Sequence, residues 1–347
     1  MSMLSAEVTE WGQPPKSIKV PPPAAPVHDN ETEIKVLAAG LHQLVRTRAA
    51  GKHYTATELP HVPGVDGVGI NLSTGKKVYF SLLGTKQGSY AEIVNAPTHN
   101  IVELPEGVDP VVAAAMVNPV MASWMALRKR VDWTGKEGKP YKVFINGVTS
   151  ASGKIAIKVA RHLGATTVVG AARNKDALSK LDLDASVVLQ EPNATDFSAA
   201  ADADIVLDFL YGPWPNAFLL SPSTASAKNP ITWINIGSMA GDIGEISAMG
   251  LRRRDVTVRG SGPGAWDPRE LGVETEGMLK VLVGLGDEGL KKYRIEDVEE
   301  GWEEFGLNVA IPVPAVWDHP PTSHQRSDNP GRTDDPKTTS TLHTRNS

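Results

Sequence analysis

Residues 143–164, VFINGVTSASGKIAIKVARHLG, constrain the fold of this 347-residue chain more than any other segment. They place an apolar strand, a turn rich in small residues and an amphipathic helix in succession. A second apolar strand follows at residues 167–172. This order predicts a βαβ unit, in which a helix joins two parallel strands and covers one face of the sheet.

The turn at residues 147–153 is suited to a phosphate group. Gly147 lets the strand turn, Gly153 permits close packing of the helix on the strand, and small side chains let an anion approach the helix N-terminus. We expect a dinucleotide pyrophosphate to contact Thr149, Ser150, Ala151, Ser152 and Gly153. The spacing departs from G-x-G-x-x-G, so a turn that binds nothing is the alternative. The strand before it and the helix and strand after it favour the dinucleotide.

Cations stand where the second strand ends. An acidic residue at this point binds the ribose 2′-hydroxyl of NAD, but the chain has Arg173, Asn174 and Lys175. The planar guanidinium of Arg173 matches a 2′-phosphate, so we expect NADPH to be the cofactor. The alternative is that Arg173 and Lys175 are solvated residues at the start of a helix.

The pattern around this unit predicts two architectures. Strands are expected near 142–148, 166–171, 186–189, 204–210, 231–237 and 255–260, with helices between most of them, which predicts a doubly wound parallel sheet. Residues 31–105 indicate short strands and turns with one helical segment near 41–50. Helical character starts at Asp109, and Pro119 is expected to kink or restart that helix. Helices near 269–285 and 295–305 and a strand near 308–313 follow.

Composition excludes several classes of function. The chain contains no cysteine, so it has no disulfide, thiolate zinc site or cysteine nucleophile. Its net charge of −5 gives no reason to expect nucleic acid or an anionic membrane as a partner. No apolar run reaches the roughly 20 residues of a membrane span, and the N-terminus does not have the pattern of a secretory signal. We expect a cytoplasmic protein with a disordered tail at 316–347.

Several further segments carry a family resemblance. They are VLAAG at 36–40, PHVPGVDGVG at 60–69, GSYAEI at 88–93 and LPEGVD at 104–109. Together with the phosphate turn, they resemble the medium-chain dehydrogenase/reductase superfamily, in its zinc-independent quinone oxidoreductase and enoyl reductase branch. The resemblance implies an α/β chain with a GroES-like β-rich catalytic domain at 1–120 and 262–315. It places a Rossmann NADP-binding domain at 121–261.

The departures from the zinc-dependent members bear on the chemistry. Those members have Gly-His-Glu where this chain has Gly64, Val65 and Asp66, and their catalytic cysteine falls near Leu41 or His42. Valine does not bind zinc, so no metal is expected. The resemblance then implies hydride transfer from NADPH to a small electrophilic substrate, either a quinone or an α,β-unsaturated carbonyl. Asn235 and Gly237 are expected to hold the nicotinamide carboxamide.

The proton donor is less constrained. The resemblance places a tyrosine at the loop that contains Tyr54, which we interpret as the candidate donor, while a packed loop tyrosine is the alternative. Asn118 is a second candidate, with helix N-capping as its alternative, and water as the proton source requires neither residue. The competing function is a catalytically silent NADPH-binding or sensor protein on the same fold. Relatives are often dimers, so the resemblance allows a homodimer.

Overall fold

The computed structural model of the chain describes residues 2–26, 30–53, 55–135, 138–267, 269–303 and 308–311. The predictions for Tyr54 and for the tail at 316–347 fall outside these residues. The strands are β1 (Met3–Glu7), β2 (Lys16–Val20), β3 (Glu31–Leu41), β4 (Asp66–Asn71), β5 (Lys77–Ser81), β6 (Ile93–Pro97), β7 (Ile101–Glu103), β8 (Lys142–Asn146), β9 (Thr167–Ala172), β10 (Ala185–Val188), β11 (Ile205–Asp208), β12 (Ile231–Asn235), β13 (Val256–Gly260), β14 (Lys291–Arg294) and β15 (Asn308–Ile311).

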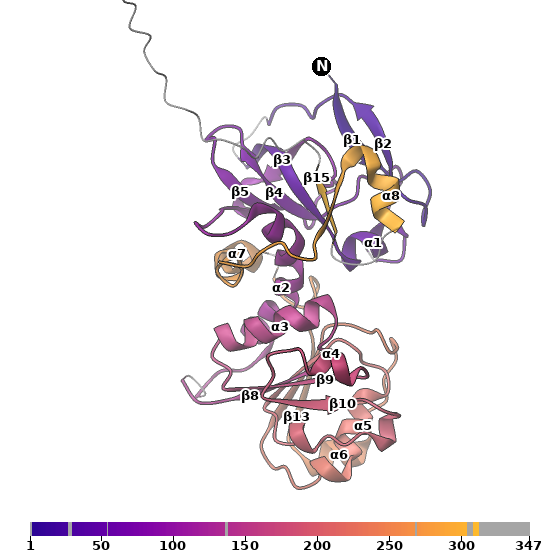
Figure 1. The fold of residues 1–347 in the computed structure, drawn as a ribbon, viewed down its shortest axis with the longest axis vertical. Coiled ribbons are helices and arrows are strands. Elements are labelled where there is room, and N and C mark those ends of the chain that lie inside the picture. The colour runs from indigo at the N-terminus through magenta and orange to yellow at the C-terminus, as the bar shows by residue number, and fades with distance from the viewer. Residues whose placement is uncertain are drawn as a thin grey trace, which may run out of the picture. The chain divides into compact units, whose positions relative to one another are not determined.

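The α-helices are α1 (Gln43–Ala49), α2 (Pro110–Arg130), α3 (Ala151–His162), α4 (Lys175–Leu178), α5 (Trp214–Leu220), α6 (Ala248–Arg253), α7 (Glu270–Lys280) and α8 (Val298–Glu303). Short 3₁₀ turns are η1 (Thr98–Asn100), η2 (Pro192–Ala194), η3 (Ser198–Ala200), η4 (Pro222–Thr224) and η5 (Ile295–Asp297). Figure 1 shows the fold as a ribbon, with the α-helices and many of the strands labelled.

The six strands predicted between residues 142 and 260 are confirmed, and they form one parallel sheet. Their order is β10-β9-β8-β11-β12-β13, so the chain runs outward from β8 in one direction and then from β11 in the other. This is the doubly wound order of dinucleotide-binding folds. The order reverses between β8 and β11, and ligands of such sheets bind beyond the carboxyl ends of the strands at that point.

Alternation along β8 explains why both faces of this sheet are covered. Val143 and Ile145 point into a core shared with α2 and α3, whereas Phe144 points into a second core on the opposite face with α5. Phe144 stacks on Phe218 of α5, with ring centroids 5.8 Å apart. A strand buried on both faces reads as a continuous apolar run, which is how residues 143–145 were interpreted from sequence.

The second sheet is built mainly from antiparallel strands in the order β14-β15-β3-β4-β5-β7, with β6 also paired to β3. The strand expected near 308–313 is confirmed as β15, which runs antiparallel to β3. The C-terminal part of the described chain therefore completes a sheet begun near the N-terminus. A β-rich module interrupted by a Rossmann sheet is the predicted architecture, and it is confirmed.

Helix α2 begins where the sequence predicts, but the restart expected as one alternative at Pro119 is wrong. Asp109 caps it by accepting hydrogen bonds from the N–H groups of Val111 and Val112, but the helix continues through Pro119 without a restart. Apolar packing on both sides stabilises the helix against the loss of one backbone hydrogen bond at proline. Among the described residues, α2 is the one helix long and apolar enough to span a membrane, and 78% of its most apolar window is buried within the protein. That burial is typical of a core helix.

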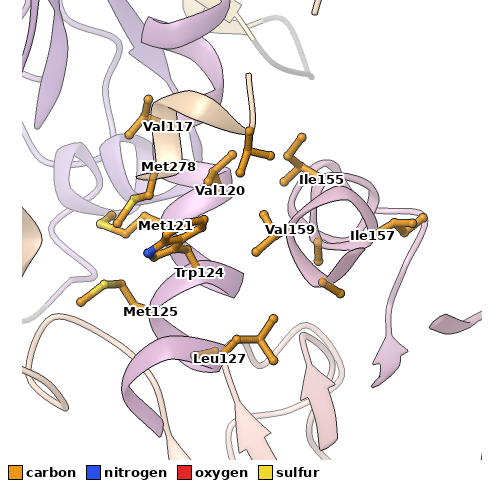
Figure 2. Close-up of a cluster of buried hydrophobic side chains, with 14 of the residues drawn as sticks. Val117, Val120, Met121, Trp124, Met125, Leu127, Ile155, Ile157, Val159 and Met278 are labelled. Carbon is orange, nitrogen blue, oxygen red and sulfur yellow. The ribbon is translucent and has the colours of Figure 1, made fainter. Parts of the chain in front are cut away.

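Figure 2 shows the core that α2 forms with α3 and α7. Trp124 and Met125 of α2 are buried, as is Met278 of α7, and Ile155 and Val159 of α3 lie opposite them. The four-residue spacing in α3 puts both of its residues on one face of the helix. Packing, rather than pocket lining, is therefore the role of the α2 tryptophan and methionine.

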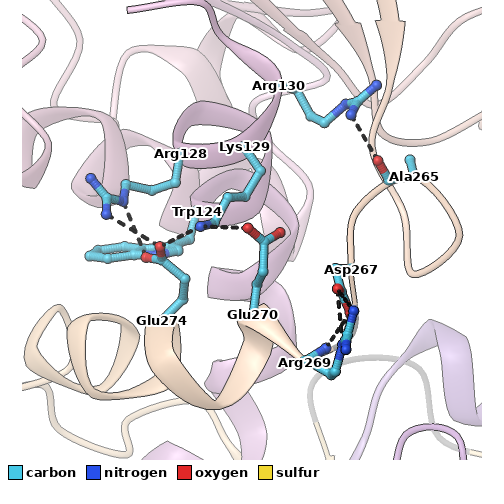
Figure 3. A network of polar contacts seen from close by, with 9 residues as sticks. All are labelled: Trp124, Arg128, Lys129, Arg130, Ala265, Asp267, Arg269, Glu270 and Glu274. Carbon is cyan, nitrogen blue, oxygen red and sulfur yellow. Dashed lines mark hydrogen bonds and ion pairs between the residues drawn. The ribbon is translucent and has the colours of Figure 1, made fainter.

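A buried carboxylate joins α2 to α7 at the edge of this core (Figure 3). Glu274 accepts hydrogen bonds from Trp124 Nε1 at 2.7 Å and from Arg128 Nε at 3.1 Å, and it pairs with Lys129 at 3.1 Å. Burial acts to raise the pKa of Glu274, but the hydrogen bonds from Arg128, Trp124 and Lys129 outweigh it and lower the pKa. Glu274 is therefore a charged anchor between the two helices.

We expect Glu274→Gln to lower the free energy of unfolding by about 1–2 kcal/mol at neutral pH, because a charge-assisted network loses its anion. The folded pKa lies below the unfolded one, so the carboxylate stabilises the fold above the unfolded value and this contribution disappears as pH falls through the folded pKa. Urea unfolding from pH 7 down to pH 3 measures this loss. Glu276→Gln is the control, since Glu276 forms an exposed pair with Lys280 that solvent screens, so this variant should unfold close to wild type. Equal effects of the two variants at pH 7 would contradict the role of Glu274.

Candidate functional site

The turn after β8 has the backbone geometry of a phosphate site. Gly147 adopts φ +92°, a left-handed conformation that favours glycine. The N–H groups of Gly147 and Val148 both donate to the Ala171 carbonyl at 3.0 Å, which fixes the turn against β9. The loop therefore leaves β8 at the point where the strand order reverses.

The first turn of α3 leaves two backbone donors for a ligand. Ser150 caps the helix, because its Oγ accepts from the Gly153 N–H at 3.0 Å and donates to the Gly147 carbonyl at 2.9 Å. The Ser150 hydroxyl is thus already used within the turn. The N–H groups of Ala151 and Ser152 are the ones without an intrahelical acceptor. They lie at the positive end of the helix dipole, which attracts anions.

Gly153 makes this close approach sterically feasible. A Cβ at this position would lie 2.7 Å from Val148 Cα and even closer to the Gly147 carbonyl oxygen. Both are backbone atoms, so they cannot move aside as a flexible side chain can. The helix start and the turn therefore pack together only because residue 153 has no side chain.

The predicted cations follow β9 and are accessible. Arg173, Asn174 and Lys175 are all exposed. The Asn174 side chain caps α4 by accepting from the Ala177 N–H at 3.0 Å, so it supports the backbone at this position. Within the described residues, the Arg173 guanidinium has no hydrogen-bond or ion-pair partner and faces solvent. It is available to an anion at the edge of the sheet.

The residues predicted to bind the carboxamide follow β12. Asn235 Nδ2 donates to the Gly237 carbonyl at 2.8 Å, and the Gly237 N–H donates to the Asp208 carbonyl at 3.1 Å. Asn235 and Gly237 thus stabilise each other's positions beside the end of β11. The carbonyl of Gly237 retains a second lone pair for a ligand.

Asp208 is a buried residue at this edge that the sequence analysis missed. Its carboxylate accepts from Asn146 Nδ2 at 3.0 Å, from Trp233 Nε1 at 2.9 Å and from the backbone N–H groups of Leu210 and Tyr211. Burial raises the pKa of Asp208, against the lowering effect of these four donors. The network connects the ends of β8 and β11 to the middle of β12. An aspartate that closes an apolar strand is the sequence signal that points to it.

A pocket of about 550 Å³ lies at the loops that follow β3 and β5. It is lined by Leu44, Arg48, His53, Thr55, Thr57, Leu83, Gly84, Thr85, Lys86, His99, Asn100, Pro263, Gly264, Trp266, Arg269 and Leu271. The volume suits a small ring or a short chain. Tyr54, the predicted proton donor, lies outside the described residues, but His53 and Thr55 on either side of it line this pocket.

Asn118 does not have the helix-capping role considered for it. It lies half-buried in the middle of α2, and the N-cap of that helix is Asp109. The error arose because Pro119 was interpreted as the start of a new helix. Asn118 is also absent from the residues that line the 550 Å³ pocket.

His42 and Asp66, which lie in the segments that the sequence analysis compares with zinc-dependent enzymes, belong to a buried polar cluster. His42 Nε2 lies 3.2 Å from Asp66 Oδ1, and Tyr79 donates its hydroxyl to Asp66 Oδ2 at 2.8 Å. Burial raises the pKa of Tyr79 well above its usual value, and the adjacent carboxylate adds to this effect, so the phenol keeps its proton. Both oxygens of Asp66 are therefore engaged within the protein.

Comparison with known proteins identifies the relatives of this chain. No family model matches it. A probable NADPH-dependent quinone reductase of Emericella nidulans is 32% identical over 332 residues, covering 82% of this chain and 91% of that protein. The chain belongs to the quinone oxidoreductase branch of the medium-chain dehydrogenase/reductase superfamily. The resemblance stated from sequence is thus confirmed.

Two further members of this superfamily extend the comparison. A trans-enoyl reductase of Aspergillus terreus is 23% identical over 320 residues, covering 78% of this chain and 87% of that protein. The quinone oxidoreductase of Thermus thermophilus, solved alone and with NADPH, superimposes with a TM-score of 0.68 at 22% identity. It covers 89% of this chain and is itself fully covered. The superposition supports the GroES-like and Rossmann architecture described above.

Proposed function

We propose that this protein is an NADPH-dependent oxidoreductase that reduces a quinone or an α,β-unsaturated carbonyl. The proposal rests on two features that lie at one edge of the sheet. One is a tight glycine turn beside helix N–H groups that have no intrahelical acceptor, and the other is Arg173, which is exposed and has no partner among the described residues. Its membership of a superfamily branch that includes a quinone reductase and a trans-enoyl reductase supports the choice of acceptor.

The described residues fit the cofactor, because the N–H groups of Ala151 and Ser152 have no intrahelical acceptor and Gly153 lets the turn pack against them. We assign the pyrophosphate to the N–H groups of Ala151 and Ser152, with hydroxyl contacts from Thr149 and Ser152 and support from Ser150 and Gly153. We assign the 2′-phosphate to Arg173 and Lys175, positioned by Asn174, and the carboxamide to Asn235 and Gly237. Bound there, NADPH supplies a hydride to an electron-poor carbon of the acceptor.

The protein's own contribution is to orient the acceptor and to provide a proton. We propose Tyr54 as the hydrogen-bond donor to the oxygen that gains negative charge, since its neighbours His53 and Thr55 line the pocket. Asn118 is retained as a weaker polar candidate. If water delivers the proton, replacing Tyr54 with phenylalanine leaves turnover largely intact.

We further propose that the reaction is zinc-independent. Cysteine is missing from the sequence, Val65 offers no ligand, and His42 and Asp66 are paired with each other. We propose residues 1–120 with 262–315 as the catalytic domain and 121–261 as the nucleotide-binding domain. We also propose that the protein is cytoplasmic and forms a homodimer. Its partner is a small-molecule substrate, not nucleic acid or a membrane.

An acceptor screen tests this function. Purified protein is expected to oxidise NADPH when 1,2-naphthoquinone or a simple enone such as 3-penten-2-one is added, with slower oxidation of NADH. Absorbance at the nicotinamide band measures the rate. Micromolar NADPH binding without turnover on any acceptor would support a silent binding protein instead.

A further inference from the structure

Arg48 on α1 is buried, and no described residue forms a hydrogen bond or ion pair with its side chain. Its side chain is 6% exposed, its Nε is fully buried and unpaired, and the described residues offer its guanidinium no hydrogen bond or ion pair. Arg254 is equally buried, at 7% exposed, but it donates to the carbonyls of Ala201, Ala203 and Asn229. The contrast matters because burying a charge without compensation is costly.

Arg48 is one of the residues that line the 550 Å³ pocket. Two other cations share that lining, and each already has an anion: Lys86 pairs with Glu58 at 2.9 Å, and Arg269 pairs with Asp267 at 2.6 Å. Among the described residues, the lining includes no aspartate or glutamate. Arg48 is therefore the lining cation whose charge the described chain leaves uncompensated.

The neighbouring histidines respond to this charge. Burial lowers the pKa of His53, and the positive charge of Arg48 lowers it further. The pKa of His61 falls to about 4 for the same two reasons. Both imidazoles are thus neutral at physiological pH, so they neither compete with Arg48 for an anion nor neutralise it.

We propose that Arg48 binds an ionised oxygen group of the hydride acceptor, such as a carboxylate, and that this pocket selects anionic quinones or enones. The inference rests on the proposed function and adds the charge class of the substrate. A guanidinium offers parallel N–H donors that match two oxygens of a carboxylate. The apolar lining from Leu44, Leu83 and Trp266 suits the remainder of an unsaturated acceptor.

Matched acceptors test the proposal. One pair is 4-oxo-2-pentenoate and its methyl ester, and the other is 1,2-naphthoquinone-4-sulfonate and 1,2-naphthoquinone. Arg48→Leu is expected to lower kcat/KM for an anionic member by about tenfold to a hundredfold and for its neutral partner by less than about threefold. The ratio is compared between wild type and variant, because the members of a pair differ in intrinsic reactivity. If Arg48→Leu changes the anionic-to-neutral ratio in only one of the two pairs, that pair shows whether the acceptor is an enone or a quinone.

Two controls separate binding from structure. Lys86→Met removes a paired cation of the same pocket and should leave the anionic-to-neutral ratio within about twofold of wild type. Arg48→Lys should keep part of the preference, since it keeps the charge and loses the planar fork. Arg48→Leu should melt no lower than wild type without ligand, because it removes a buried unpaired charge. A lower melting temperature with equal losses on both acceptors, or a raised KM for NADPH alone, would overturn the proposal.

A binding measurement keeps the inference independent of turnover. The ligand is 4-oxopentanoate, a saturated analogue with no carbon–carbon double bond to accept a hydride. Calorimetry is expected to show that it binds wild type and binds Arg48→Leu about tenfold more weakly. Methyl 4-oxopentanoate should bind both proteins equally. If wild type reduces no acceptor, the proposed function fails while this result still supports the anion site. Equal affinity of both proteins for 4-oxopentanoate rejects the site itself.

Discussion

Replacing Arg173 with aspartate is expected to lower kcat/KM for NADPH by about two to three orders of magnitude, while kcat/KM for NADH stays within about threefold. A charge-assisted hydrogen bond contributes about 1.5–3 kcal/mol, and the new carboxylate adds repulsion against a 2′-phosphate. Arg173 is exposed and unpaired within the described residues, so the substitution removes no contact that stabilises the fold. Steady-state kinetics with both nucleotides at one fixed acceptor concentration measures the effect.

Lys180→Asp is the matched control for that experiment. Lys180 is also exposed, and the substitution makes the same change in net charge a few residues further along the chain. We expect it to alter kcat/KM for NADPH by less than about threefold, because solvent and salt screen charges that lie away from the phosphate. If Arg173→Asp weakened both nucleotides equally, Arg173 would have no part in distinguishing them.

The nucleotide-binding half of the fold could be predicted because its signals are local. The apolar run at 143–145, the small residues after it and the arginine after β9 each follow from what one strand or one turn requires. The strand order was also implied, since alternating strands and helices permit few topologies. The continuation of α2 through Pro119 without a restart could not be predicted, because packing against α3 and α7 outweighs the local effect of the proline.

Arg48 and Asp208 show what sequence reasoning misses. In the sequence, an arginine near the end of a short helix indicates a solvated cation beside the helix C-terminus. Its place in a pocket wall depends on residues far away in the chain, since Trp266 and Leu271 line the same pocket. Asp208 similarly depends on Asn146 and Trp233, which only the completed sheet brings together. The role of a charged residue cannot be predicted from one sequence when that role depends on contacts with residues far away in the chain.

Gly153→Ala is expected to weaken NADPH binding by about a hundredfold and to lower the free energy of unfolding by about 1–3 kcal/mol. In an ordinary helix the same change would stabilise the protein by up to about 1 kcal/mol, so the sign of the effect is itself diagnostic. The added methyl group would meet the backbone of Gly147 and Val148, which must move away from α3. That movement displaces the N–H groups of Ala151 and Ser152 from the position a pyrophosphate requires.

Gly260→Ala provides the comparison, because a Cβ at the end of β13 meets no atom within 4 Å and the backbone there does not require glycine. We expect that variant to bind NADPH and to unfold as wild type does. Fluorescence titration with NADPH and urea unfolding of both variants separate the two effects. Wild-type affinity in Gly153→Ala would mean that the turn binds no phosphate. Weakened affinity with unchanged stability would mean that the alanine side chain blocks the ligand without displacing the backbone.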